Sequence, residues 1–186
     1  MFAFAFTLLV IGFAVPQLEK ATDATLRDAL LRLWPNLIAY GLSAGVVGIM
    51  WHNHQALYRL VDRIDRTSNF WNLMLLAGTA FVPFATQVLG NYPLLRPSTF
   101  LYGATLSFCS TAYNIMLNHL VRSKAFNSRV SAGAIAGTVR AYRVGWITYM
   151  LAMLIGLIAP VVSFAAYIGI TLYYVIPHGV DRDAVA

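Results

Sequence analysis

The sequence carries little charge, and its long apolar runs carry none. Only 11% of the 186 residues are charged, whereas 59% are hydrophobic. Soluble domains are about 25% charged. All seven acidic residues lie between or beyond the apolar runs, so no carboxylate is expected at membrane depth, where proton-coupled transporters and pumps usually need one. The composition therefore predicts an all-α, polytopic membrane protein and argues against a proton-coupled pump.

Cysteine is almost absent, and the few histidines are scattered. Cys109 is the one cysteine, so no disulfide can form within the chain. His52 and His54 are two residues apart and cannot share a helix face, while His119 and His178 stand alone. The sequence also lacks a convincing Ser/His/Asp or Cys/His set. We therefore expect no enzyme activity, no metal site and no other cofactor.

The net charge of +6 does not indicate a nucleic-acid partner, because the cations lie in loops. Nine fall in three segments expected on one side of a membrane: Arg59, Arg63, Arg66, Arg122, Lys124, Arg129, Arg140, Arg143 and Arg182. Four fall on the other side: Lys20, Arg27, Arg32 and Arg96. Because cytoplasmic loops are enriched in Lys and Arg, both termini are expected in the cytoplasm.

Charge-free windows mark the expected membrane spans. Four windows can each hold one helix of about 20 residues: residues 1–18, 33–58, 67–95 and 97–121. The window 144–180 is long enough for two helices divided at Pro160, the first of them beginning a little before Val144. We therefore expect one domain over residues 1–186 with six transmembrane helices, the last ending near Pro177.

A short amphipathic stretch lies between the first two spans. Thr22 or Asp23 can cap a helix there, and apolar side chains recur on one face at Leu26, Ala29, Leu30 and Leu33. We expect a helix on the membrane surface that ends near Trp34. Pro35 then suits the first turn of the next span.

Two further patterns predict contacts between helices. Small residues form a ridge at Gly41, Gly45 and Gly48. Polar residues form a stripe at Ser107, Thr111, Asn114 and Asn118. The stripe is expected to hydrogen-bond between helices. The alternative is a carrier, in which a polar cavity inside the subunit forms around Asn114, Asn118 and His119.

The first span, MFAFAFTLLVIGF, is apolar on every side. Phe4, Thr7, Leu8 and Ile11 share one helix face, and we expect that face to line a pore while the others pack in a bundle. Ordinary packing on all sides is the alternative. From Met1 to Pro16 a helix covers roughly 22 Å, less than the roughly 30 Å hydrocarbon core, so the sequence is expected to begin partway along a helix.

A pore in this protein would have to be narrowed by side chains. The sequence contains neither a TVGYG-like carbonyl filter nor a ring of acidic residues. One helix per chain can enclose a pore only in a symmetric assembly. Four copies of Phe4, Thr7, Leu8 and Ile11 would form apolar rings, which gate by dewetting, and one ring of hydroxyl groups, which offers partial ion coordination.

The segment FAFAFTLLVIGFAVP resembles the first helix of the transmembrane protein 175 family, the lysosomal potassium channels of animals and their prokaryotic relatives. Trp51 and His54 at the end of the second span fit the same pattern, as do Asn72 and Pro83-Phe84 in the third. The resemblance covers most of the six-helix unit. It implies a potassium-selective or potassium-preferring channel.

The resemblance also implies roles and an assembly. Phe4, Leu8 and Ile11 would form the apolar constriction, with Thr7 between them as a contributor to selectivity. Trp51, His54 and Asn72 would form a supporting polar network. Because prokaryotic members are homotetramers of six-helix subunits, one unit here implies a homotetramer in the cell membrane of a prokaryote, with potassium as the permeant ion.

The sequence departs from the family at its start. The family signature, an arginine followed shortly by Phe-Ser-Asp, would lie just before Met1 and is absent from this sequence, so the polar network lacks its first-helix partners. Phe4 is also bulkier than the aliphatic residue usual there, which implies a tighter constriction. A non-selective cation channel or a proton leak on the same fold stays open as an alternative.

Overall fold

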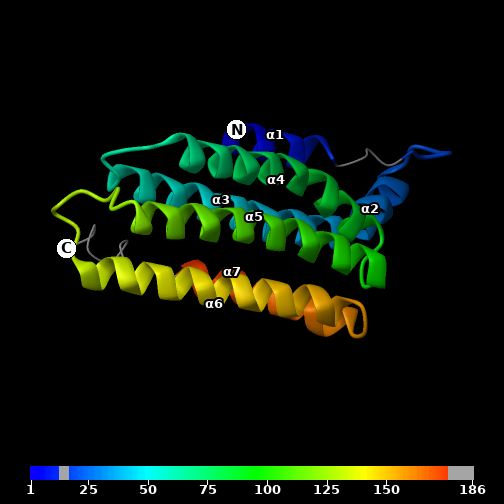
Figure 1. Cartoon of the computed structure of the whole chain (residues 1–186). Coiled ribbons are helices and arrows are strands. Elements are labelled where there is room, and N and C mark those ends of the chain that lie inside the picture. The colour runs from blue at the N-terminus through cyan, green and yellow to red at the C-terminus, as the bar shows by residue number, and fades with distance from the viewer. Residues whose placement is uncertain (13–16, 176–186) are drawn as a thin grey trace.

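The computed structural model describes residues 1–12 and 17–175, and this part of the chain is all-helical (Figure 1). It forms seven helices: α1 (Phe2–Ile11), α2 (Asp23–Arg32), α3 (Trp34–Arg59), α4 (Arg66–Asn91), α5 (Arg96–Arg122), α6 (Ala132–Gly156) and α7 (Pro160–Val175). The described residues form no β-strand and only one isolated β-bridge, between Val61 and Phe126. The all-α prediction is therefore confirmed.

The helices form an elongated bundle with α1 and α6 at opposite edges (Figure 1). Helix α4 packs against both α3 and α5, and α1 lies on α3 and α4. Helix α6 packs against α5 and α7, and α7 returns to contact α3 and α5. Fully buried side chains such as Val47, Val82, Tyr102 and Met116 fill the centre. The arrangement leaves α1 covered on one side only.

The two ends of the bundle differ in chemistry. At one end the α3–α4 and α5–α6 loops are joined: the Asp62 amide donates to the Ala125 carbonyl (2.9 Å) and the Asn127 amide to the Leu60 carbonyl (3.0 Å). At the other end the Asn36 amide group donates to Asn91 Oδ1 (2.8 Å). The two basic loops that were expected on one side of the membrane therefore lie at the same end of the molecule.

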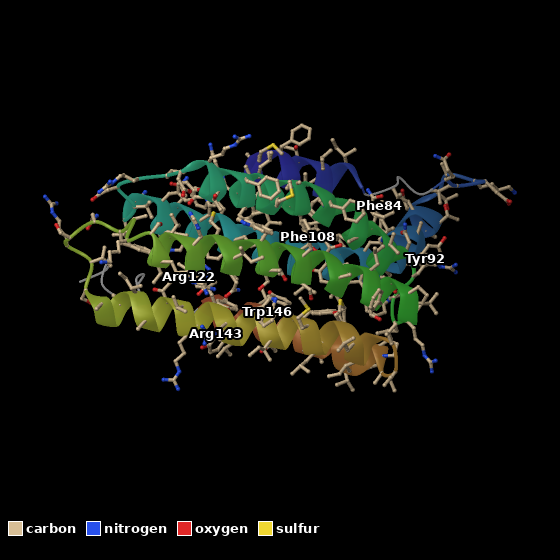
Figure 2. The ribbon with its side chains drawn as sticks, viewed as in Figure 1. Phe84, Tyr92, Phe108, Arg122, Arg143 and Trp146 are labelled. Carbon is tan, nitrogen blue, oxygen red and sulfur yellow. The ribbon has the colours of Figure 1, made fainter. Side chains whose placement is uncertain are left out.

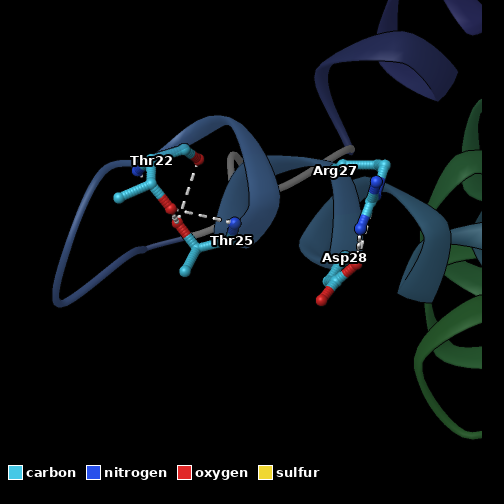
Figure 3. A network of polar contacts seen from close by, with 4 residues as sticks. All are labelled: Thr22, Thr25, Arg27 and Asp28. Atoms are coloured by element: carbon cyan, nitrogen blue, oxygen red, sulfur yellow. Dashed lines mark hydrogen bonds and ion pairs between the residues drawn. The ribbon is translucent and has the colours of Figure 1, made fainter.

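The helix expected between the first two spans is present as α2. Thr22 caps it: its hydroxyl oxygen accepts from the Thr25 amide (3.2 Å), while the Thr22 amide donates to the Thr25 hydroxyl oxygen (3.0 Å) (Figure 3). One turn on, Arg27 and Asp28 form an exposed ion pair of 3.5 Å (Figure 3). Pro35 lies in the first turn of α3, as predicted. No residue of α2 is buried, and its place at a membrane surface stays a prediction.

One predicted boundary is wrong. The fifth span was expected to begin a little before Val144, but α6 begins at Ala132, so Arg140 and Arg143 are helical. Ser131 caps this start by accepting from the Ala134 amide (3.1 Å). The cations do not interrupt the helix because they occupy its exposed side, while Ala134, Thr138 and Ala141 face inward. The break at Pro160 is confirmed, since α6 ends at Gly156 and α7 begins at Pro160.

By length and apolar composition, α4 is the one described helix suited to cross a membrane, and the α2–α3 pair, bent by 47°, would supply a second if taken as a single span. The six-span topology stays a prediction. The expected stops at Pro16 and Pro177 lie outside the described residues, as do His178 and Arg182.

Candidate functional site

Helix α1 has one covered and one open side. Phe2, Ala5 and Leu9 are only 7%, 1% and 3% exposed because they pack toward α3 and α4. On the other side Phe4 is 60% and Ile11 is 74% exposed. Thr7 is exposed and Leu8 half-buried. The structure thus places Phe4, Thr7 and Ile11 on the side of α1 that its own subunit leaves uncovered, while Leu8 is partly covered.

Thr7 is the polar member of this open side. Its hydroxyl donates to the Phe4 carbonyl of the same helix (2.8 Å). Because the hydrogen is used within the helix, the oxygen lone pairs are left to accept from water or to contact a cation. Thr7 can therefore supply oxygen ligands, while its apolar neighbours repel water.

A polar pair supports the covered side of α1. His54 Nε2 on α3 lies 2.8 Å from Asn72 Oδ1 on α4, and because an amide oxygen only accepts, the ring N–H donates. The Phe2 ring lies 5.4 Å from the His54 ring, and the Tyr58 ring stacks on it at 4.4 Å. This contact ties the start of α1 to α3 and α4.

Trp51 lies apart from this pair. Its side chain is 47% exposed on α3, and within the described part of the chain it forms no hydrogen bond with His54 or Asn72. Of the three residues expected to form a polar network, the structure therefore brings two together and leaves the third open.

The polar stripe of α5 faces α6. The Trp146 indole N–H donates to Thr111 Oγ1 (2.9 Å), and Figure 2 shows Trp146 between the two helices. The Asn114 side chain donates to the Tyr142 carbonyl of α6 (3.2 Å), and the Asn118 side chain donates to the Asn114 carbonyl (2.8 Å). Thr111 and Asn114 therefore hydrogen-bond to α6, as expected, whereas Asn118 bonds within α5 and the buried Ser107 hydroxyl finds no hydrogen-bond partner among the described residues.

A cavity inside the described part of the subunit lacks the polar wall that a carrier would need. It measures about 60 Å³, lies between α3, α5, α6 and α7, and is lined by side chains such as Val46, Leu106, Tyr113 and Tyr149. Asn114, Asn118 and His119 do not line it. Its wall is mostly aliphatic and aromatic, which is suited to packing rather than to passing a polar solute.

The sequence interpretation missed one ion pair at the basic end. His119 Nε2 lies 2.6 Å from Asp65 Oδ2. Asp65 also caps α4, since its Oδ1 accepts from the Ser68 amide (2.8 Å). This backbone hydrogen bond, followed by the contact with His119, holds the pKa of the Asp65 carboxyl well below its usual range. The capping role of Asp65 could have been read from the sequence, because an aspartate three residues before Ser68 is a local signal. Its contact with His119 could not, because the two residues are 54 positions apart.

Comparison with known protein families gives a match over residues 1–83 to the model described as endosomal/lysosomal potassium channel TMEM175. A potassium channel from Chamaesiphon minutus is 30% identical over 179 residues, covering 94% of this chain and 88% of that protein. A potassium channel from Streptomyces collinus is 32% identical over 181 residues, covering 94% and 86%.

A solved structure shares the fold over nearly the whole chain. It is the crystal structure of a lysosomal potassium-selective channel TMEM175 homolog from Chamaesiphon minutus, with a TM-score of 0.81 and 28% sequence identity. The match covers 94% of this chain and 90% of the homolog. The likeness therefore extends well beyond the matched segment of residues 1–83.

Proposed function

Because the chain belongs to the TMEM175 family of potassium channels, we propose that four copies of its helix α1 line the ion pathway. Relatives from two bacteria are named potassium channels, and this chain is a potassium channel rather than an enzyme. A potassium path needs a pore wall, an assembly that encloses it and a defined orientation in the membrane.

The open side of α1 carries the proposal. A helix at the edge of the bundle exposes 60% of Phe4 and 74% of Ile11 although both side chains are apolar. One such helix cannot surround an ion, whereas four related by a fourfold axis can. A homotetramer with α1 on the axis would cover this side and use it as a pore wall.

The order of side chains along α1 suggests how the pore works. Rings of Phe4, Leu8 and Ile11 would form an apolar constriction that sheds water and raises the barrier to a hydrated ion. The Thr7 ring lies between the Phe4 and Leu8 rings. It would supply four hydroxyl oxygens to a potassium ion as the ion loses its hydration water. Potassium is then the permeant ion, and the mechanism needs no resident cofactor.

The His54–Asn72 pair is proposed to hold α1 in this position. A hydrogen bond of 2.8 Å between α3 and α4, with Phe2 against the imidazole, fixes the side of the helix opposite the pore. Trp51 stays a proposed member of this network, since it lies about one helical turn before His54 on α3.

We propose six membrane spans, with both termini on the cytoplasmic side of a prokaryotic cell membrane. The shared end of the α3–α4 and α5–α6 loops supports this orientation because it gathers Arg59, Arg63, Lys124 and Arg129 at one side. Membrane lipid then surrounds the bundle.

Ion flux from the purified protein in liposomes tests the proposal. Separate gradients of potassium, sodium and protons should show potassium flux exceeding sodium flux, with a small proton leak. Equal fluxes of all cations would support the non-selective alternative. No flux above empty liposomes would overturn the pore assigned to α1.

A further inference from the structure

An open groove of about 770 Å³ runs along the outer side of α6, beside the end of α5. Its wall is largely aliphatic and includes Ile135, Val139, Val144 and Ile147. Two arginines, Arg140 and Arg143, line the same groove.

Neither arginine forms a salt bridge with an acidic residue in the described part of the chain. Both are exposed, and at spacing i, i+3 they share a helix face. The ion pairs formed by the described residues are Arg27–Asp28 and His119–Asp65, and neither involves this groove. Figure 2 shows Arg122 at the end of α5 and Arg143 about midway along α6. The groove therefore offers two guanidinium groups to an anion from outside.

The direction of the two arginine side chains determines where along α6 that anion would lie. In a helix the side chains lean toward the N-terminus, so both guanidinium groups reach toward the basic end. After Arg143, α6 continues through thirteen residues without charge, Val144–Gly156, or roughly 20 Å. The groove thus has an apolar wall on both sides of Arg140 and Arg143, and the uncharged stretch of α6 continues from its far end.

We propose that this groove binds an anionic phospholipid, with its phosphate headgroup on Arg140 and Arg143 and its acyl chain along the apolar wall. The proposal rests on the proposed function in one respect. With α1 on the central axis, α6 lies at the opposite edge of the subunit and faces lipid (Figure 1). Arginine pairs phosphate oxygens through two parallel hydrogen bonds, and the aliphatic wall matches an acyl chain in polarity.

Native mass spectrometry of the purified oligomer, titrated with phosphatidylglycerol or with phosphatidylcholine of the same acyl chains, tests the site. The wild type should bind phosphatidylglycerol about tenfold more tightly than phosphatidylcholine. Arg140→Gln/Arg143→Gln should abolish this preference, and Arg140→Lys/Arg143→Lys should retain much of it. Inorganic phosphate at the same concentration should not displace the lipid, because it cannot occupy the apolar wall.

Arg59→Gln/Arg63→Gln is the matched control, because it removes two exposed cations from the same end but outside the groove. It should keep the preference for phosphatidylglycerol. Equal losses in both double variants would overturn the site in favour of diffuse attraction to anionic lipid. A lower oligomer mass of Arg140→Gln/Arg143→Gln without any lipid would overturn it in favour of a contact between subunits.

Liposome flux separates this inference from the pore assignment. Potassium flux with no preference for phosphatidylglycerol would overturn the lipid site and leave the pore intact. A clear preference without any potassium flux would overturn the pore and leave the lipid site standing.

Discussion

Ile11 and Leu9 are two positions apart in α1, yet one is 74% exposed and the other 3%. Both are large and aliphatic, so neither hydropathy nor helix propensity separates them. Only their direction differs: Leu9 packs into the core shared with α3 and α4, and Ile11 points away from it. At this scale a single substitution can tell a pore wall from a packing surface.

Ile11→Asn should give larger currents and weaker discrimination between potassium and sodium, with the fold intact. Its amides would replace an apolar ring with groups that tolerate water, which lowers the barrier to a hydrated ion. Single-channel recording in planar bilayers with paired potassium and sodium gradients measures both effects.

Leu9→Asn is the matched control, because it makes the same chemical change on the buried side. It should reduce expression or thermal stability by placing an unpaired amide in the core. If Leu9→Asn altered conductance and selectivity while Ile11→Asn altered neither, the pore face would be assigned to the wrong side of α1.

Asp65→Ala should lower the midpoint of thermal unfolding at pH 7 by about 2–4 °C, because the carboxylate caps α4 and pairs with His119. The folded state lowers the pKa of this carboxyl. Its contribution is therefore present above the ordinary aspartate value of about 4 and is lost as the pH falls from there. Thermal unfolding in detergent at pH 7 and at pH 3 should show a difference from wild type that shrinks in acid.

Asp62→Ala serves as the control for this cap, since Asp62 is an exposed loop carboxylate of the same charge and its backbone contact with Ala125 does not involve the side chain. It should leave the midpoint unchanged. Equal effects of the two substitutions would show that general charge at this end, rather than the cap, is responsible.

At the scale of the helices, the predicted ridge packs closely at Gly45, where a methyl group would come 3.3 Å from the Thr171 methyl group on α7, but not at its other two glycines. A methyl group at Gly41 would meet nothing within 4 Å, and one at Gly48 would come no nearer than 3.7 Å to Phe6. On α5, by contrast, a methyl group at Gly103 would overlap the Tyr167 hydroxyl and come 2.9 Å from Met153 Cα. Helices α5, α6 and α7 therefore meet closely at Gly103.

Gly103→Ala should destabilise the subunit by about 1–3 kcal/mol, because the Met153 backbone and the buried Tyr167 ring cannot both move aside. Gly41→Ala, the same change in open space, should be neutral or slightly stabilising. Unfolding of both variants by detergent titration compares them directly. A tolerated Gly103→Ala would show that α6 and α7 shift easily against α5.

At the scale of the whole molecule, the assembly is expected to be a homotetramer with α1 at its centre. In a Cys109→Ser background, Ile11→Cys should cross-link between subunits with a short bis-maleimide, because four copies would face one axis. Leu9→Cys should not, since Leu9 is covered by its own subunit. Denaturing gels give the result, and a monodisperse monomer that still conducts would contradict it.

The orientation in the membrane is tested at the two ends of the bundle. Ser128→Cys lies in the α5–α6 loop at the basic end, and Leu94→Cys lies in the α4–α5 turn at the other end. In intact cells an impermeant maleimide should label Leu94→Cys and should reach Ser128→Cys only after lysis. The reverse pattern would place the termini outside.

The sequence by itself determined most of the helices, because each follows from local charge, hydropathy and capping. Thr22 as the cap of α2, Pro35 in the first turn of α3 and the break before Pro160 all depend on neighbours within a few residues. The sequence did not give the start of α6, because the charges of Arg140 and Arg143 indicated a loop. In the structure this segment is helical because Ala134 and Ala141 give it a buried side.

The tertiary structure decided what depends on residues far apart in the chain. Helix α1 is apolar all round, so only its packing on α3 and α4 settles that Leu9 is covered and Ile11 is open. The pairing of Asp65 with His119 and the separation of Trp51 from the His54–Asn72 pair likewise depend on how the helices lie against one another. A helix period specifies which residues share a face, whereas a neighbouring helix decides which face is buried.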